Sequence, residues 1–170
     1  MTMKAASIRL LLLALTMAAL LPNLPVNCLS IGDGRTTLFS APVSLGAPFV
    51  TEYVHSVQLT PVIDEYRILQ GRLWSWEERV QSHNAGLPYD APPRGRFILA
   101  PPWMIVRGGG IGTERIVYRI GTAELGRNLW RLPPYEDIEA YAILPSARVF
   151  IETSVERLKD AMVRGFRRPM

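Results

Sequence analysis

Apolar and polar residues alternate with a period of two through most of the chain after residue 48, as in β-strands with one buried face. In the first run, odd-numbered residues from Phe49 to Leu59 lie on one face and even-numbered residues from Val50 to Gln58 on the other. Similar short runs, separated by Gly, Pro and Asn, follow at residues 62–69, 72–82, 96–106, 114–121, 128–132, 139–144 and 147–152. This succession predicts an all-β fold, a small antiparallel β-sandwich or barrel.

Two details of the pattern give further expectations. In the run 72–82, alternation places Trp74, Trp76 and Val80 on a common face. The glycine-rich segment Gly108–Gly112 precedes a β-like run, whereas a phosphate-binding glycine loop must open a helix. We therefore expect a hairpin loop at this segment.

The first 28 residues differ from the rest. Lys4 and Arg9 precede a run from Leu10 to Leu21 that is apolar except for Thr16, which is the order of a secretory signal peptide. The run is shorter than the roughly 20 residues of a transmembrane helix, although an uncleaved membrane anchor stays a second interpretation. Cleavage after Ala19 or at Cys28 fits the pattern, and Asn27 disfavours lipidation of Cys28 because that modification needs a small preceding residue. Residues 1–28 are thus predicted to be a signal peptide or anchor, and residues 29–152 an exported β-domain in the periplasm or on the outer face of the cytoplasmic membrane.

A helical pattern closes the chain, at residues 153–170. Thr153 and Glu156 have the spacing of a capping box. The apolar stripe that follows consists of Val155, Leu158, Met162 and Phe166, and a basic tail ends the chain. The pattern predicts a short amphipathic helix that covers an open sheet, with contact to an anionic membrane surface as the second interpretation.

Charge and cysteine content exclude several classes of function. The net charge is +4, but residues 1–28 hold two basic residues and no acidic one, so the remainder carries only +2. A nucleic-acid partner is therefore not expected, because no stripe of Lys and Arg with interleaved aromatic residues is present. The single cysteine, Cys28, excludes an intramolecular disulfide and a Cys-based zinc cluster.

A histidine and two carboxylates stand close together in the stretch YVHSVQLTPVIDEY, residues 53–66. A two-residue loop in a hairpin here places His55 opposite Asp64, and a three-residue loop places it opposite Glu65. A turn that starts at Pro61 separates the pair. Facing groups are compatible with a general base or the start of a metal site. We favour a buried, hydrogen-bonded structural pair, since such pairs are common in small domains.

A second polar group, residues 81–88, contains Ser82, His83 and Gly86. Neither the HExxH pattern of zinc sites nor the GxSxG pattern of a nucleophile elbow occurs here. We therefore assign no catalytic residue, no metal ligand and no cofactor from the sequence.

Three motifs carry a resemblance to a known family. HSV at 55–57, TPVIDEY at 60–66 and QSHNAGLP at 81–88, in this order, are similar to the family called domain of unknown function 1850. The resemblance spans residues 28–152, while His83 and the basic tail depart from the family pattern. It implies a small exported or membrane-tethered β-domain, often encoded beside TRAP-type (TAXI) solute transporters.

Two functional hypotheses follow. The first is a non-catalytic extracytoplasmic accessory or binding module whose partner is a transporter membrane subunit or solute-binding subunit, and whose N-terminal segment contacts the membrane. Its candidate binding residues are His55, Ser56, Asp64, Glu65, Ser82 and Gly86. The alternative is a metal- or acid/base-assisted hydrolase that uses His55 and Glu65.

Overall fold

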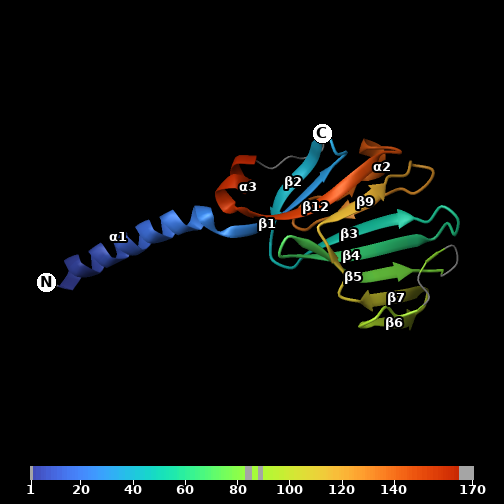
Figure 1. The fold of residues 1–170 in the computed structure, drawn as a ribbon, viewed down its shortest axis with the longest axis horizontal. Coiled ribbons are helices and arrows are strands. Elements are labelled where there is room, and N and C mark those ends of the chain that lie inside the picture. Colours follow the sequence, from blue (N-terminus) through green and yellow to red (C-terminus); the bar gives the residue numbers. More distant parts are fainter. Residues whose placement is uncertain (1, 83–85, 88–89, 165–170) are drawn as a thin grey trace.

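The computed structural model describes residues 2–82, 86–87 and 90–164. Their main body consists of two antiparallel β-sheets (Figure 1). The smaller sheet has the strand order β2 (Thr37–Val43), β1 (Pro25–Gly32), β12 (Arg148–Arg157), β9 (Arg115–Arg119). The larger has the order β11 (Ile138–Glu139), β10 (Leu129–Arg131), β3 (Ala47–Val54), β4 (Pro61–Leu69), β5 (Arg72–Val80), β7 (Trp103–Gly108), β6 (Gly95–Ala100), and β8 (Gly112–Thr113) also pairs with β5. The predicted all-β fold of antiparallel sheets is confirmed.

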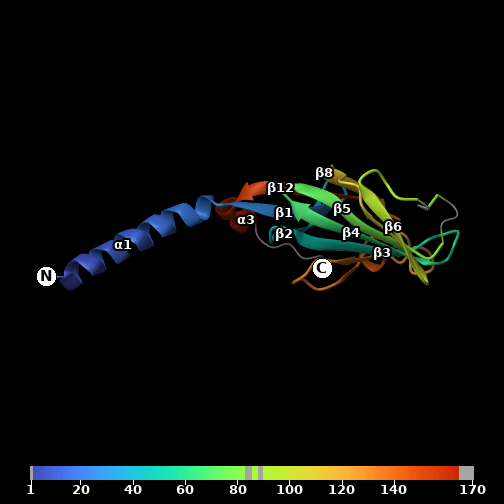
Figure 2. The same cartoon turned by 90° about the horizontal axis from the view of Figure 1, so that it is seen from below.

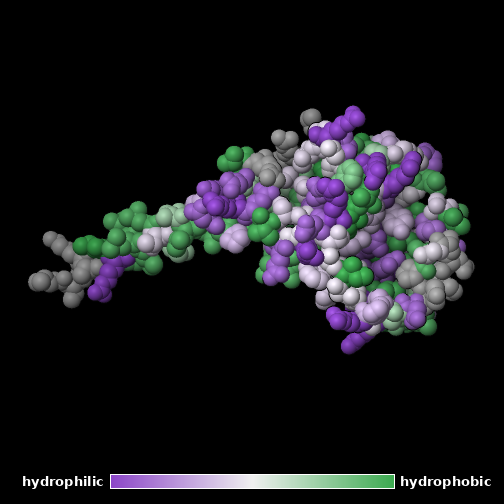
Figure 3. Space-filling view, viewed as in Figure 1, coloured by the Kyte–Doolittle hydropathy of each residue, from purple (hydrophilic) through white to green (hydrophobic). Residues whose placement is uncertain are grey.

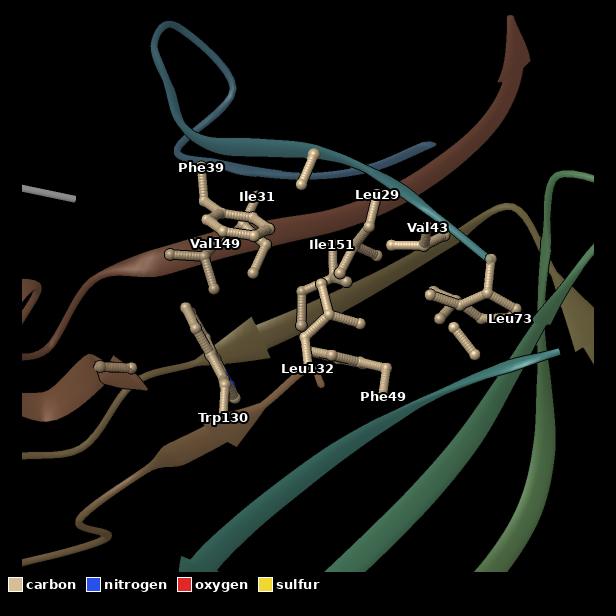
Figure 4. Close-up of a cluster of buried hydrophobic side chains, with 14 of the residues drawn as sticks. Leu29, Ile31, Phe39, Val43, Phe49, Leu73, Trp130, Leu132, Val149 and Ile151 are labelled. Atoms are coloured by element: carbon tan, nitrogen blue, oxygen red, sulfur yellow. The ribbon is translucent and has the colours of Figure 1, made fainter. Parts of the chain in front are cut away.

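The hydrophobic core lies between the two sheets (Figure 4). Its largest fully buried side chains include Leu29, Ile31 and Ile151 of the smaller sheet and Phe49 and Leu73 of the larger. Burial of each such side chain stabilises the fold by about 1.5–3 kcal/mol. The predicted alternation holds along β3, where Ala47, Phe49 and Thr51 are buried.

A β-bulge changes the predicted face of the tryptophans. The pairing of β4 with β5 shifts between Glu65 and Tyr66, which leaves Trp76 as an extra residue in β5. Trp74 pairs with Arg67, whose guanidinium lies 5.4 Å from the centre of the Trp76 ring. Val80, by contrast, is fully buried opposite Val62 on the other face of the sheet. The prediction of a common face for all three residues is therefore wrong, because alternation reverses across a bulge.

The glycine-rich segment leads into a strand, as predicted, but it is not a hairpin loop. Both β7 and β8 pair with β5, so residues 103–113 follow one edge of that strand with an interruption between them. The Ser75 backbone N–H donates to the Ile111 carbonyl at 2.9 Å across the interruption. A Cβ atom on Gly112 would lie 2.9 Å from the Trp74 ring, so the indole requires glycine there.

The predicted start of the C-terminal helix is also wrong. Thr153 and Glu156 belong to β12, which runs to Arg157, and helix α3 covers only Leu158–Arg164. The Thr153 hydroxyl donates to the buried Gly71 carbonyl at 2.8 Å, and its backbone N–H donates to Glu114. Pairing with β1 thus takes the place of the capping box. Phe166 and the end of the basic tail lie outside the described residues.

At the other end, helix α1 (Thr2–Leu20) and a 3₁₀ turn (Leu21–Asn23) project away from the sheets (Figures 1 and 2). The described side chains of α1, residues 7–20, are exposed and mostly apolar (Figure 3). Within the described part of the chain, no helix is long and apolar enough for a membrane span.

Strand β1 begins inside the segment that the sequence assigned to the signal or anchor. Pro25–Cys28 pair with residues 154–157 of β12. Asn27 is buried and its side-chain oxygen accepts a hydrogen bond from the Gly71 N–H at 2.9 Å. The β-domain thus starts four residues before the predicted boundary.

Candidate binding site at the end of the sandwich

The connection from β3 to β4 decides where the predicted polar residues lie. Val54 pairs with Pro61, so residues 55–60 form a six-residue loop rather than a tight turn. In this register Asp64 lies opposite Thr51 and Glu65 lies opposite Val50. The predicted pairing of His55 with either carboxylate is therefore wrong.

His55 instead organises the loop. Its backbone N–H donates to Thr60 at 2.9 Å, and its carbonyl accepts from Leu59 at 2.8 Å. The side-chain Nδ1 accepts hydrogen bonds from the backbone N–H groups of Val57 and Gln58, both at 3.2 Å. Because Nδ1 accepts these hydrogen bonds, the proton of the neutral ring lies on Nε2. The Nε2–H group is therefore a donor that the loop backbone does not use.

The other predicted residues are distributed over separate places. Glu65 forms an ion pair with Arg67 at 2.5 Å on the face opposite to Asp64. The Ser82 hydroxyl donates to the Gln58 side chain at 3.0 Å, which joins the end of β5 to the loop. Gly86 has a φ of +88°, as in a turn that favours glycine. His83 lies outside the described residues.

Asp64 is hydrogen-bonded across the two sheets rather than to histidine. The Tyr118 hydroxyl donates to Oδ2 of Asp64 at 2.8 Å, and the Thr51 hydroxyl donates to the same oxygen at 3.4 Å. The Thr51 and Tyr118 hydroxyls are themselves 2.7 Å apart. Since Tyr118 belongs to β9, this contact joins the smaller sheet to the inner face of the larger one.

A second carboxyl group faces Asp64. Glu78 lies directly opposite it across β4 and β5. Burial, and then the charge of Asp64, raise the pKa of Glu78 to about 7. Burial also raises the pKa of Asp64, although its hydrogen bonds to Tyr118 and Thr51 oppose this. Near neutral pH, Glu78 is thus partly protonated, so the pair carries less than two full charges.

Tyrosines surround these carboxyl groups. Burial, and then the charge of Asp64, raise the pKa of Tyr53 to about 12 and raise the pKa values of Tyr66 and Tyr118 further, so all three hydroxyls stay protonated. We call this set the acid–tyrosine cluster: Thr51, Tyr53, Asp64, Tyr66, Glu78 and Tyr118. Among the described residues, no group of three potential metal ligands occurs, here or elsewhere.

A pocket of about 480 Å³ lies beside the cluster, at the end of the sandwich. We call it the end pocket; it is lined by Tyr53, Val54, His55, Ser56, Arg119, Ile120, Gly121, Thr122, Leu125, Gly126, Asn128 and Ser146. It thus contains two of the predicted binding residues, His55 and Ser56, and shares Tyr53 with the cluster. Asp64, Glu65, Ser82 and Gly86 do not line it.

Two glycines shape the far wall of the end pocket. A Cβ atom on Gly121 would lie 2.1 Å from the Leu125 carbonyl oxygen, so only glycine permits this tight approach. Gly126 has a φ of +94°, and its carbonyl accepts a hydrogen bond from the Val54 N–H at 2.7 Å. The loop after β9 is therefore fixed to the end of β3 and forms a built wall.

Sequence reasoning missed Glu78, Tyr118 and Arg119. Glu78 lies close to the bulge, which reverses the alternation along β5, so the sequence pattern does not show which face its side chain is on. Tyr118 is 54 residues from Asp64 in the chain. Tyr118 is the single tyrosine of β9, and only the packing of the two sheets shows its partner.

Comparison with known proteins shows that this region is similar to a family. The model of the family described as Domain of unknown function (DUF1850) matches residues 49–130. This segment of the chain is similar to the DUF1850 family. It runs from β3 to β10 and includes the whole acid–tyrosine cluster and all of the end pocket except Ser146. No curated protein and no solved structure matches the chain.

Proposed function

We propose that this chain is a non-catalytic binding domain that acts outside the cytoplasm as an accessory of a TRAP-type (TAXI) solute transporter. Its ligand occupies the end pocket, and its partner is the membrane subunit or the solute-binding subunit of the transporter. The observation that carries the proposal is the end pocket itself, which brings Tyr53, His55 and Ser56 together with Arg119 from the other sheet. Pockets with a few convergent polar groups on an apolar scaffold are the usual form of small-molecule sites.

The geometry favours binding over the hydrolase alternative. That mechanism needs His55 and Glu65 side by side, with a ring nitrogen able to take a proton. Nδ1 of His55 is occupied by two backbone N–H groups, and Glu65 is paired with Arg67 on the outer face of the sheet. The resemblance to a family often encoded beside TAXI transporters supports the accessory role.

The location of the domain is part of the same proposal. The order of charges and apolar residues at positions 4–21 supports export to the periplasm or to the outer face of the cytoplasmic membrane. The exposed apolar side chains of α1 support membrane association of the N-terminal segment.

A pocket-filling variant tests the proposal in cells. Ser56 is exposed and lines the end pocket, so Ser56→Trp is expected to fill the pocket without disturbing the core. Val57→Trp is the matched control, because Val57 is in the same loop, is 68% exposed and does not line the pocket. We expect deletion of the chain and Ser56→Trp both to reduce uptake by the neighbouring TAXI transporter, while Val57→Trp leaves uptake unchanged. Normal uptake in the deletion strain contradicts the accessory role.

A further inference from the structure

We propose that the end pocket binds a small monocarboxylate whose carboxylate group pairs with Arg119. This inference rests on the proposed function only in taking the end pocket as a ligand site, and it adds the chemical class of the ligand.

The charge of the pocket lining favours an anion. Of the twelve residues that line the end pocket, Arg119 is the only one that is Lys, Arg, Asp or Glu. Its side chain belongs to the end of β9, an edge strand of the smaller sheet. The guanidinium group is a planar fork that binds a carboxylate through two parallel hydrogen bonds.

Arg119 also occupies a costly position. It lies directly opposite Arg148 on β12, and like charges at opposed positions of two strands destabilise the pair. Arg148 has a compensating contact, since its guanidinium lies 5.4 Å from the centre of the Phe150 ring. For the Arg119 side chain, the described part of the structure shows no hydrogen bond or ion pair. A bound anion offsets the repulsion between the guanidinium groups of Arg119 and Arg148. We therefore assign the Arg119 side chain to ligand binding rather than to folding.

Neutral donors complete the recognition. Ser56 and Ser146 add hydroxyl groups to the lining, and His55 adds its Nε2–H. Helix N-termini are common phosphate-binding sites, but none of the described helices contributes a residue to this pocket. The lining therefore fits a carboxylate better than a phosphate.

The acid–tyrosine cluster limits the ligand to one negative charge. Tyr53 forms the boundary between the end pocket and the cluster, and it experiences the charges of Asp64 and Glu78. These carboxylates repel a second negative charge on the ligand. Leu125, Ile120 and Val54 offer apolar contacts to the remainder of the molecule. A monocarboxylate with a short apolar part satisfies all of these features.

The test uses the full-length protein in detergent, with butyrate, succinate and inorganic phosphate as probes in a calorimetric or nuclear magnetic resonance titration. We expect saturable binding of butyrate and weaker binding of the dianionic succinate and of phosphate. Arg119→Gln is expected to weaken butyrate binding about tenfold, the scale of one charge-assisted contact, and Arg119→Lys by less, because it keeps the charge but loses the fork. Arg96→Gln, at an exposed position on the distant edge strand β6, is the matched control and is expected to leave binding unchanged.

Absence of saturable butyrate binding overturns the inference, as does phosphate binding as tight as that of butyrate, or an equal effect of Arg119→Gln and Arg96→Gln. These outcomes leave the accessory role standing if Ser56→Trp still impairs uptake. Conversely, normal uptake in the deletion strain removes the accessory role and leaves the measured carboxylate binding intact.

Discussion

Glu78 lies directly opposite Asp64 across strands β4 and β5, while its chain neighbour Glu77 is opposite Glu65. Successive residues of a strand face opposite sides, so two adjacent glutamates meet two different environments. Glu78 faces a carboxylate and tyrosines, whereas Glu77 accepts hydrogen bonds from Arg79 and, at 2.6 Å, from Arg107. The two glutamates are therefore expected to respond to pH in opposite directions.

Glu78→Gln is expected to make the β-domain more resistant to alkaline pH. Because the pKa of Glu78 is raised from 4.5 to about 7 in the folded state, that state binds more protons than the unfolded chain between these values. The contribution of Glu78 to stability is therefore present at acidic pH and is lost as the pH rises through about 7. At about pH 8 the variant is expected to be more stable than the native chain by about 1 kcal/mol, allowing for partial solvent screening. Urea unfolding at a series of pH values measures this difference.

Glu77→Gln is the matched comparison and has the opposite sign. Burial alone would raise the pKa of Glu77, but its hydrogen bonds and ion pairs with Arg79 and Arg107 outweigh burial and lower it. Its stabilising contribution is thus present at neutral pH and is lost as the pH falls below about 4.5. The variant is expected to be less stable at neutral pH and to differ little from the native chain in strong acid. The same pH slope for both variants contradicts the assignment of their environments.

Tyr118→Phe tests the hydrogen bond that joins the two sheets. The change removes the donor 2.8 Å from Asp64 and leaves Oδ2 with only the longer contact to Thr51. Since a buried carboxylate loses a partner, we expect a loss of about 1–3 kcal/mol in the free energy of unfolding. Tyr141→Phe is the control, because its ring contacts Arg127 and the described structure shows no hydrogen bond from its hydroxyl. Equal midpoints of urea unfolding for the two variants count against a structural role for the Tyr118 hydroxyl.

The fold class was readable from the sequence because alternation and Gly/Pro punctuation are local signals. The register was not, since it depends on interactions between distant segments. The run through residue 59 continues the strand pattern, yet the hydrogen bonds of His55 close a loop and end β3 at Val54. Likewise, the bulge at Trp76 reverses the faces of β5, and Thr153 exchanges a local cap for the distant Gly71 carbonyl.

The candidate site was only partly predictable for the same reason. His55, Ser56 and Asp64 were found because polar residues in an apolar run are conspicuous. Their partners come from the other sheet, as Tyr118 does for Asp64, or from the loop after β9, as Gly121 and Gly126 do for the end pocket. Such contacts join residues far apart in the chain, and no periodicity records them.

Two truncated chains test where the β-domain begins. A chain that starts at Leu24 keeps all of β1 and the hydrogen bond from the Leu158 N–H to the Leu24 carbonyl. A chain that starts at Leu29 loses the pairing of residues 25–28 with β12, together with the Asn27 contact to Gly71. We expect the shorter chain to be less stable by about 3 kcal/mol or more, as for loss of buried hydrogen-bonded structure. Equal melting temperatures for the two chains contradict a domain that starts at Pro25.

His55→Asn and His55→Ala separate a structural role from a chemical one. Asparagine retains a side-chain oxygen that accepts the N–H groups of Val57 and Gln58 in the manner of an Asx turn, whereas alanine leaves both donors without that partner. We expect His55→Ala to lower the free energy of unfolding by about 1 kcal/mol and His55→Asn to restore most of that loss. Because the loop forms one wall of the end pocket, His55→Ala is also expected to weaken butyrate binding more than His55→Asn does. If both variants match the native chain in stability, Nδ1 does not hold the loop, and the wall of the pocket is fixed by the strand ends alone.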